Sequence, residues 1–248
     1  DVGHDDQYAA RPPRPTPTGA WGARVEVSVE AGTGSLVNPA PSTAIGATAA
    51  SLPRGRHDLT RDQVAQSQRL RLAVAMAEAC VGRGYSDTPV AAVLELAGVS
   101  RQTFYALYAN KLECFLEALD LVGEVIIARM GAALLAPERP PLDRAIDAFD
   151  RYLEVIADHP AFARLYVVEV HAAGPEALVR RAELQATVID ALADLLGKQD
   201  PDGRFACEAF VAGVSALVTL PLATGDVDSI AALRSPLVGR LRALAAEL

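Results

Sequence analysis

The sequence predicts an all-α protein. Alanine and leucine outnumber valine and isoleucine in a 248-residue chain that is 51% hydrophobic and only 5% aromatic, a composition that favours helix over strand. From Thr60 onward, apolar residues recur at steps of three and four, and clusters of Gly, Pro or Asp separate the periodic segments. The alternating run Arg24–Ala31 is isolated, and a strand without a partner is only marginally stable.

The first 52 residues differ from the rest of the chain. Pro, Gly, Ala, Ser and Thr dominate residues 1–52, and no periodicity is sustained there. Such a composition does not bury enough apolar surface to form a core. We therefore expect a largely disordered extension.

Two helices are expected next. Thr60 can cap a helix that runs to about Val81, with an apolar stripe at steps of three and four. Thr88 followed by Pro89 predicts an N-cap and a first helical position for a short helix through about Leu96. Its inward face would be formed by Val90, Val93 and Leu94.

A tight turn and a third short helix follow. Gly98 permits a left-handed backbone, Val99 can anchor the turn, and Ser100 can cap a helix from Arg101 to about Tyr108. Two short helices joined by a glycine turn predict a helix-turn-helix. Helical spacing separates an inward set from an outward set: Phe104, Leu107 and Tyr108 inward, and Arg101, Gln102 and Tyr105 outward.

The rest of the chain predicts a helical bundle. Asn110 can cap a helix from Lys111 to about Leu135. Further helices are expected over 142–158, 161–172, 175–196, 204–220 and 227–248, with Ser235–Pro236 splitting or kinking the last one. Three cysteines, Cys80, Cys114 and Cys207, lie far apart in apolar helical settings, which favours buried reduced thiols.

The charge distribution places any DNA-facing surface before the bundle. The net charge is −8, but residues 53–115 hold eight Lys/Arg against six Asp/Glu, whereas residues 116–248 hold twelve against twenty. A slight basic excess permits DNA binding without demonstrating it.

The stretch "MAEACVGRGYSDTPVAAVLELAGVSRQTFYALYANKLECF" resembles the DNA-binding domain of the tetracycline-repressor (TetR) family of bacterial transcription regulators. The resemblance rests on four groups of residues: Gly84 and Tyr85, Ala97 to Ser100, Thr103 to Tyr105, and Tyr108 with Lys111. The resemblance implies a three-helix DNA-binding domain with a helix-turn-helix over 53–118, and a ligand-binding and dimerisation bundle over 119–248.

Residues of the helix-turn-helix, the start of the next helix and the segment before the first helix are predicted to contact DNA or to support such contacts. The Arg101 side chain has the geometry to donate to guanine O6 and N7, and the Gln102 side chain has the geometry to bind adenine N6 and N7. The alternative for both residues is a solvated helix face. Thr103 would touch a base or support the Ser100 cap. The resemblance assigns Tyr105 and Lys111 to phosphate contacts. Arg56, with Arg54 and Arg61, would act as a basic arm or as a solvated linker.

The bundle is expected to dimerise and to bind a ligand. A single helix-turn-helix offers little contact area, so a homodimer reading a palindromic operator is expected. The dimer surface is expected on a C-terminal apolar stripe, formed by Ile230, Leu233, Leu237, Leu241, Leu244 and Leu248. Small residues of the preceding helix would complete it: Ala209, Ala212, Gly213, Ser215 and Ala216. Ordinary intrachain packing is the alternative for this set.

An apolar or aromatic effector is expected between the helices of the bundle. The candidate ligand-binding residues are Phe149, Tyr152, Phe162, Tyr166, His171 and Phe210, with Phe205 as a further aromatic; core packing is the alternative role for each. The ligand would shift the bundle toward a state that releases DNA. A repressor is expected, with an activator as the alternative.

Other classes of protein fit the sequence less well. None of the four histidines stands in a metal-ligand spacing, and no nucleophile elbow or phosphate loop is present, so neither an enzyme nor a cofactor is predicted. No membrane span or signal peptide is predicted, which favours the cytoplasm. Ala106 and Leu107 stand where the family often has polar groups, and a ligand sensor or scaffold without DNA binding is the main alternative.

Overall fold

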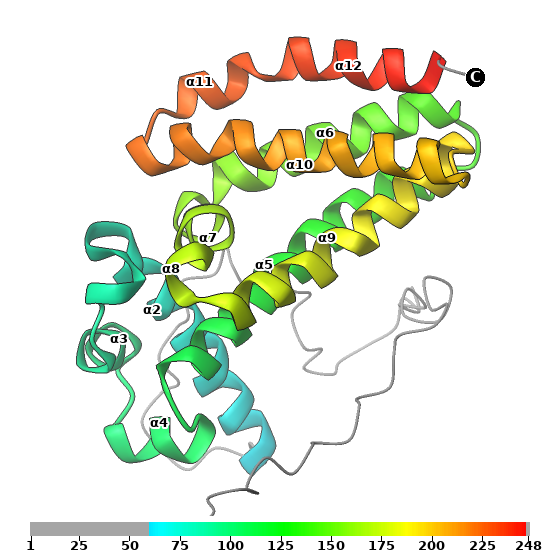
Figure 1. Cartoon of the computed structure of the whole chain (residues 1–248). Helices are drawn as coiled ribbons and strands as arrows, with labels where there is room; N and C mark the ends of the chain where they lie inside the picture. The colour runs from blue at the N-terminus through cyan, green and yellow to red at the C-terminus, as the bar shows by residue number, and fades with distance from the viewer. Residues whose placement is uncertain (1–59, 247–248) are drawn as a thin grey trace, which may run out of the picture. The chain divides into compact units, whose positions relative to one another are not determined.

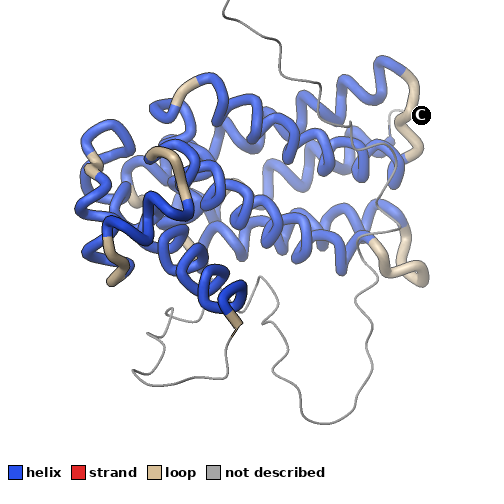
Figure 2. Tube along the Cα trace, turned by 90° about the horizontal axis from the view of Figure 1, so that it is seen from below, coloured by secondary structure: helices blue, strands red, loops and turns tan. Residues whose placement is uncertain are grey.

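A computed structural model of the chain describes residues 60–246, and every regular element among them is helical (Figure 2). The predicted fold class is therefore confirmed. The expectations for residues 1–52 and for Arg54 and Arg56 lie outside the described residues. Residues 60–246 fall within one compact unit.

The first three helices are α2 (Arg61–Asp87), α3 (Val90–Ala97) and α4 (Arg101–Leu107). Thr60 caps α2 through a capping box with Gln63. Helix α2 continues past the predicted end at Val81 and kinks at Gly84, whose φ of 75° is unsuited to other L-residues.

Thr88 does not cap α3 as expected. Its buried hydroxyl group instead lies 2.7 Å from the Gly84 carbonyl oxygen and 3.2 Å from that of Ala79, so it ties the connection back onto α2. Pro89 is the N-cap of α3.

The bundle contains α5 (Lys111–Leu134), α6 (Pro141–Asp158), α9 (Pro175–Leu196), α10 (Pro201–Thr224), α11 (Val227–Ala232) and α12 (Arg234–Ala246). The predicted bounds are close except at α10, which starts three residues earlier and ends four residues later than predicted. The early start follows from Asp200, which caps α10 by accepting from the Gly203 N–H at 3.0 Å. The last predicted helix is broken at Leu233, and Pro236 occupies the first turn of α12, where proline is tolerated.

The segment predicted as one helix over 161–172 is three pieces: α7 (Pro160–Arg164), the π-helical turn η1 (Leu165–Glu169) and α8 (Val170–Ala173). Single π-turns inside helices are rare and frequently lie at functional sites. No sequence pattern marked this one.

Helix α5 joins the first three helices to the bundle. It packs against α2 at one end and against α6 and α9 along its length, while α11 and α12 cover α6 and α10 far from α3 and α4 (Figure 1). The expected domain boundary at 118/119 falls inside α5, so the division into domains stays a proposal about function.

The C-terminal apolar stripe belongs to the intrachain core. Ile230, Leu237, Leu241 and Leu244 are buried and Leu233 is partly buried within the single chain. These residues were expected to form a dimer surface, and their packing against α6 and α10 corrects that expectation. The three cysteines are buried, as predicted.

Candidate DNA-binding helix and ligand cavity

The helix-turn-helix turn is built around Gly98. Its φ of 59° and ψ of 40° are left-handed, and its N–H donates to the Glu95 carbonyl oxygen at 3.3 Å. The Arg71 guanidinium donates to the Gly98 carbonyl oxygen at 3.0 Å and also to that of Ala97. A Cβ on Gly98 would come within 2.8 Å of this guanidinium. Arg71 and Gly98 together fix the angle between α3 and α4.

Helix α4 has one buried and one exposed face. Phe104 and the cap residue Tyr108 are buried, and Leu107 is partly buried. Arg101, Gln102 and Tyr105 are exposed, with half of the Tyr105 surface accessible. The predicted division of faces is confirmed, and the exposed residues form what we call the α4 outer face: Arg101, Gln102 and Tyr105.

Ser100 and Thr103 support the start of α4. The Ser100 side chain accepts a hydrogen bond from the Thr103 N–H at 3.1 Å, and the two hydroxyl oxygens are 2.8 Å apart. Thr103 is only partly exposed. Of the two roles considered for Thr103, support of the cap is the one with a geometric basis here.

Lys111 has intrachain partners that differ from the expected phosphate contact. Its ammonium group donates to the carbonyl oxygens of Tyr85 at 2.8 Å, Thr88 at 3.0 Å and Ser86 at 3.5 Å, and lies 4.1 Å from the centroid of the Tyr85 ring. An ammonium group has three donors. Because all three hold the α2–α3 connection, the Lys111 ammonium group has no donor left for a phosphate oxygen.

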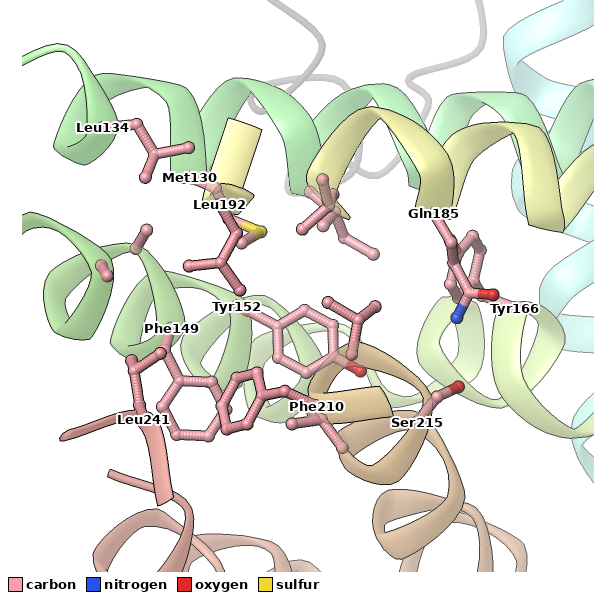
Figure 3. Close-up of a pocket in the computed structure, with 16 residues that line it drawn as sticks. Met130, Leu134, Phe149, Tyr152, Tyr166, Gln185, Leu192, Phe210, Ser215 and Leu241 are labelled. Atoms are coloured by element: carbon pink, nitrogen blue, oxygen red, sulfur yellow. The ribbon is translucent and has the colours of Figure 1, made fainter. Parts of the chain in front are cut away.

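A cavity of about 70 Å³ lies inside the bundle (Figure 3). Its walls come from α5, α6, η1, α9, α10 and α12, and are mostly apolar. The lining residues are Ile126, Met130, Leu134, Ala145, Ala148, Phe149, Tyr152, Tyr166, Gln185, Val188, Leu192, Phe210, Val211, Val214, Ser215 and Leu241.

Four of the six candidate ligand-binding residues line this cavity: Phe149, Tyr152, Tyr166 and Phe210. Phe149 packs edge-on against Phe210, with ring centroids 6.2 Å apart. Phe162 instead lines a smaller adjacent cavity of about 10 Å³.

His171 is exposed and lines neither cavity, because it lies in α8 beyond the π-turn. Phe205, the further aromatic, is 69% exposed on α10. Neither residue is therefore in a position to contact a ligand in these cavities.

Polar groups in the cavity wall are uncharged. Burial raises the pKa of Tyr166 to about 12 and raises that of Tyr152 as well, so both hydroxyl groups stay protonated at neutral pH. Sequence reasoning missed Gln185 and Ser215. The signal for Gln185 was its position three and seven residues before Val188 and Leu192, on the same face of α9.

Glu169 connects the π-turn to the kink of α2. Its side chain is buried and accepts hydrogen bonds from the Tyr85 N–H at 2.8 Å and from the Arg164 Nε at 3.0 Å. Arg164 also donates to the Ala223 carbonyl oxygen at 2.8 Å, near the end of α10. Tyr166, which lines the cavity, belongs to the same π-turn as Glu169. The cavity wall and the α2–α3 connection are thus joined by one buried carboxylate.

An apolar surface is exposed along α10. We call it the α10 outer face, and its residues are Phe205, Ala209, Ala212, Ala216, Leu217 and Leu220, all exposed. Leu220 is 70% accessible. Helix α10 is long and apolar enough to cross a membrane by length and composition alone, which the sequence expectation did not anticipate. Its other face, with Cys207, Val214, Val218 and Leu222, is buried in the bundle.

No protein-family model and no curated protein sequence matches the chain. Several solved structures do match. A TetR-like transcriptional regulator from Rhodococcus sp. RHA1 is 21% identical with a TM-score of 0.56, over 75% of this chain and 98% of that one. The fatty acid degradation regulator FadR from Bacillus halodurans is 17% identical with a TM-score of 0.62, over 72% of this chain and 98% of that one.

A third match is the transcriptional regulator FadR from Bacillus subtilis in complex with stearoyl-CoA, at 18% identity and a TM-score of 0.59, over 69% and 96% of the two chains. These proteins are transcriptional regulators, and at such identities the likeness establishes the fold. The resemblance noted in the helix-turn-helix thus extends over the bundle, and the chain has the fold of TetR-like transcriptional regulators.

Proposed function

We propose that the protein is a ligand-responsive DNA-binding transcriptional regulator that acts as a repressor. The observation that carries the proposal is the α4 outer face: two side chains suited to base edges and one tyrosine project from a short helix whose other side is fixed by buried Phe104. A helix held in this way fits the major groove of B-DNA.

Each residue of the α4 outer face has a distinct role in this proposal. Arg101 donates to guanine O6 and N7, and Gln102 contacts adenine N6 and N7. The Tyr105 hydroxyl binds a phosphate oxygen, which positions the helix without specifying sequence. Exposed Arg61 at the start of α2 adds a phosphate contact, and Arg56 extends this basic arm.

The functional unit in this proposal is a homodimer that joins two copies through the α10 outer face. This surface extends from Phe205 to Leu220, and only 28% of an apolar 18-residue window of α10 is buried within one chain. An exposed apolar face of this kind marks a protein–protein contact, and a second copy of the chain would bury it. The second copy would also supply the second recognition helix for a palindromic operator. Half-sites would lie about 34–36 Å apart.

Size-exclusion chromatography with light scattering tests the homodimer. Leu217→Glu and Leu220→Glu should yield monomers, because each places an uncompensated charge in an apolar interface. Leu135→Glu, at a site 52% exposed at the end of α5, is the matched control and should stay dimeric. A dimer that survives both α10 variants would place the interface elsewhere.

A small apolar or aromatic effector would bind in the cavity and weaken DNA binding. The cavity lies beside η1, and Glu169 links η1 to the α2–α3 connection that orients α4. A ligand that prefers a different packing of this turn would shift the two-state equilibrium. Coupling of about 1–3 kcal/mol would change operator affinity by about 5- to 150-fold. The FadR neighbour in complex with stearoyl-CoA is consistent with ligand binding in this fold.

A ligand sensor that does not bind DNA is the second candidate. Ala106 is exposed on α4 without a donor, and the Lys111 ammonium is occupied by the chain's own carbonyl groups. An enzyme is less well supported, since the matching structures are regulators. DNA binding would place the protein in the cytoplasm, with α10 as a dimer helix and not a membrane span.

Binding to duplexes selected from a random pool tests the proposal. Arg101→Ala should relax base preference at one position per half-site, with a loss of about 1–3 kcal/mol, whereas Tyr105→Phe should weaken all duplexes alike. Arg151→Ala, on the exposed surface of α6, is the control. Equal effects of the Arg101 and Tyr105 variants on every sequence would refute the assigned roles.

A further inference from the structure

The cavity has two chemically different ends. Figure 3 shows Tyr166, Gln185 and Ser215 on one side, and Leu134, Phe149 and Leu241 on the other. The Tyr152 ring lies between them with its hydroxyl group on the polar side. A molecule that fills the cavity therefore meets hydrogen-bonding groups at one end only.

The polar end is available to a ligand. Within residues 60–246, no protein group hydrogen-bonds to the hydroxyl groups of Tyr152 and Tyr166, to the Gln185 amide or to the Ser215 hydroxyl. Tyr166 and Ser215 are buried and Tyr152 and Gln185 are partly buried, and polar groups in such places usually have hydrogen-bond partners. A ligand with one acceptor or donor at this position would supply the partner.

No charged side chain of the described residues lines the cavity. The charged groups nearest the cavity lie outside its wall, although the Arg144 Nε is buried without a hydrogen-bond partner and the Arg181 charge acts on the hydroxyl groups of Tyr152 and Tyr166. Arg181 of α9 donates to the Val167 carbonyl oxygen at 3.5 Å, Arg144 of α6 donates to the Leu134 carbonyl oxygen, and Glu169 of η1 is paired with Arg164. His159 lines only the smaller cavity. An ionised ligand group would therefore be desolvated without a counter-charge in the cavity wall, which is costly.

We propose that this cavity selects an uncharged ligand: an apolar or aromatic body at the Phe149 and Phe210 end, carrying one alcohol or carbonyl group at the Tyr166, Gln185 and Ser215 end. The inference rests on the proposed ligand-binding role of the same cavity. The cavity volume of about 70 Å³ is smaller than the roughly 150 Å³ that holds benzene in a protein core. The walls must therefore move apart as the ligand enters, and small probes suit the test.

The sequence provides a direct reporter of binding. It contains two methionines: Met130 lines the cavity, and Met76 is buried in α2. In protein labelled with ¹³C at the methionine methyl groups, a ligand in the cavity should shift the Met130 signal in proportion to occupancy. The Met76 signal, which does not come from the cavity wall, is the internal control.

Five probes of similar size separate the alternatives: benzyl alcohol, acetophenone, toluene, benzoate and benzylammonium. The two neutral oxygen-bearing probes should bind more tightly than toluene by about 2- to 12-fold, the contribution of one hydrogen bond. Benzoate has to enter protonated; for a carboxyl group with a pKa near 4.3, this costs about 1000-fold at pH 7.3. Its affinity should rise about tenfold for each unit by which the pH falls toward 5.3, while that of benzyl alcohol stays constant.

Variants test the polar end. Tyr166→Phe and Gln185→Leu should lower the affinity for benzyl alcohol toward that for toluene, and leave toluene binding unchanged. Gln199→Leu, at an exposed site in the α9–α10 loop, is the matched control and should change neither.

Three results would overturn the inference: benzoate or benzylammonium binding as tightly as benzyl alcohol at pH 7.3, toluene binding as tightly as benzyl alcohol, or no Met130 shift with any neutral probe. Benzoate binding that is strong and independent of pH would indicate recruitment of Arg181 or Arg144. None of these results tests duplex binding by the α4 outer face, which is measured in a separate experiment.

Discussion

Replacement of Glu169 by glutamine tests the connection between cavity and DNA-binding helix. The carboxylate accepts from the Tyr85 N–H at 2.8 Å and from the Arg164 Nε at 3.0 Å, and its side chain is only 6% exposed. A glutamine keeps one carbonyl oxygen for one of these donors and presents an NH₂ group to the other. One charge-assisted hydrogen bond is therefore lost, which contributes about 1.5–3 kcal/mol.

We expect Glu169→Gln to lower the free energy of unfolding by about 2–3 kcal/mol. This is below the 3–5 kcal/mol typical of breaking a buried ion pair, because Arg164 keeps the Ala223 carbonyl oxygen and is partly exposed. Urea unfolding measures the change. Glu154→Gln, which breaks the exposed pair of Arg151 and Glu154, is the matched control and should cost at most about 1 kcal/mol.

Hydrogen exchange localises the effect. Loss of about 2 kcal/mol at the Tyr85 amide would speed its exchange by about 30-fold through local opening of the α2–α3 connection. The same variant should make DNA binding less responsive to any cavity ligand, since Glu169 joins η1 to that connection. If Glu169→Gln matches the Glu154→Gln control in stability and leaves exchange at Tyr85 unchanged, the proposed connection is refuted.

Three further predictions concern the same framework. Gly98→Ala should destabilise the protein by about 1–2 kcal/mol in urea unfolding, because alanine is strained at a φ of 59° and its Cβ would meet the Arg71 guanidinium; an unchanged midpoint would contradict this. Lys111→Met should lower stability but leave the salt dependence of DNA binding unchanged, since the ammonium binds chain carbonyls; a salt slope reduced by about one would restore the phosphate contact. Burial lowers the pKa of His159, so the neutral form is favoured in the folded state, and stability should fall as the pH drops below about 6.5; His159→Gln should flatten that part of the pH profile, and an unaltered profile would disprove the assignment.

Local sequence signals predicted the helix-turn-helix because each is decided within a few residues. The left-handed Gly98, the Ser100 cap and the alternation of Phe104 with Tyr105 depend on neighbours one to four positions away. The partners of Lys111 lie 23 to 26 residues earlier in the chain, so spacing along α5 gave no sign of them.

The bundle was less predictable because similar apolar stripes occur on buried and exposed helix faces. The stripe of Leu237, Leu241 and Leu244 became core, while Leu217 and Leu220 remained exposed. Only the packing of α12 on α6 and α10 decides between these outcomes. Aromatic residues marked the cavity correctly at Phe149 and Tyr152, but the π-turn that carries Tyr166 depends on tertiary packing and has no local signature.

The most direct test of the central claim compares the affinity of the full chain for a duplex selected from a random pool with that for a scrambled duplex of the same length. At about 0.15 M salt, a homodimer that reads two half-sites through the α4 outer face should bind the selected duplex at least about 1000-fold more tightly. A ratio near one, with a steep salt dependence for both duplexes, would show attraction to phosphate without recognition of bases and would contradict the account.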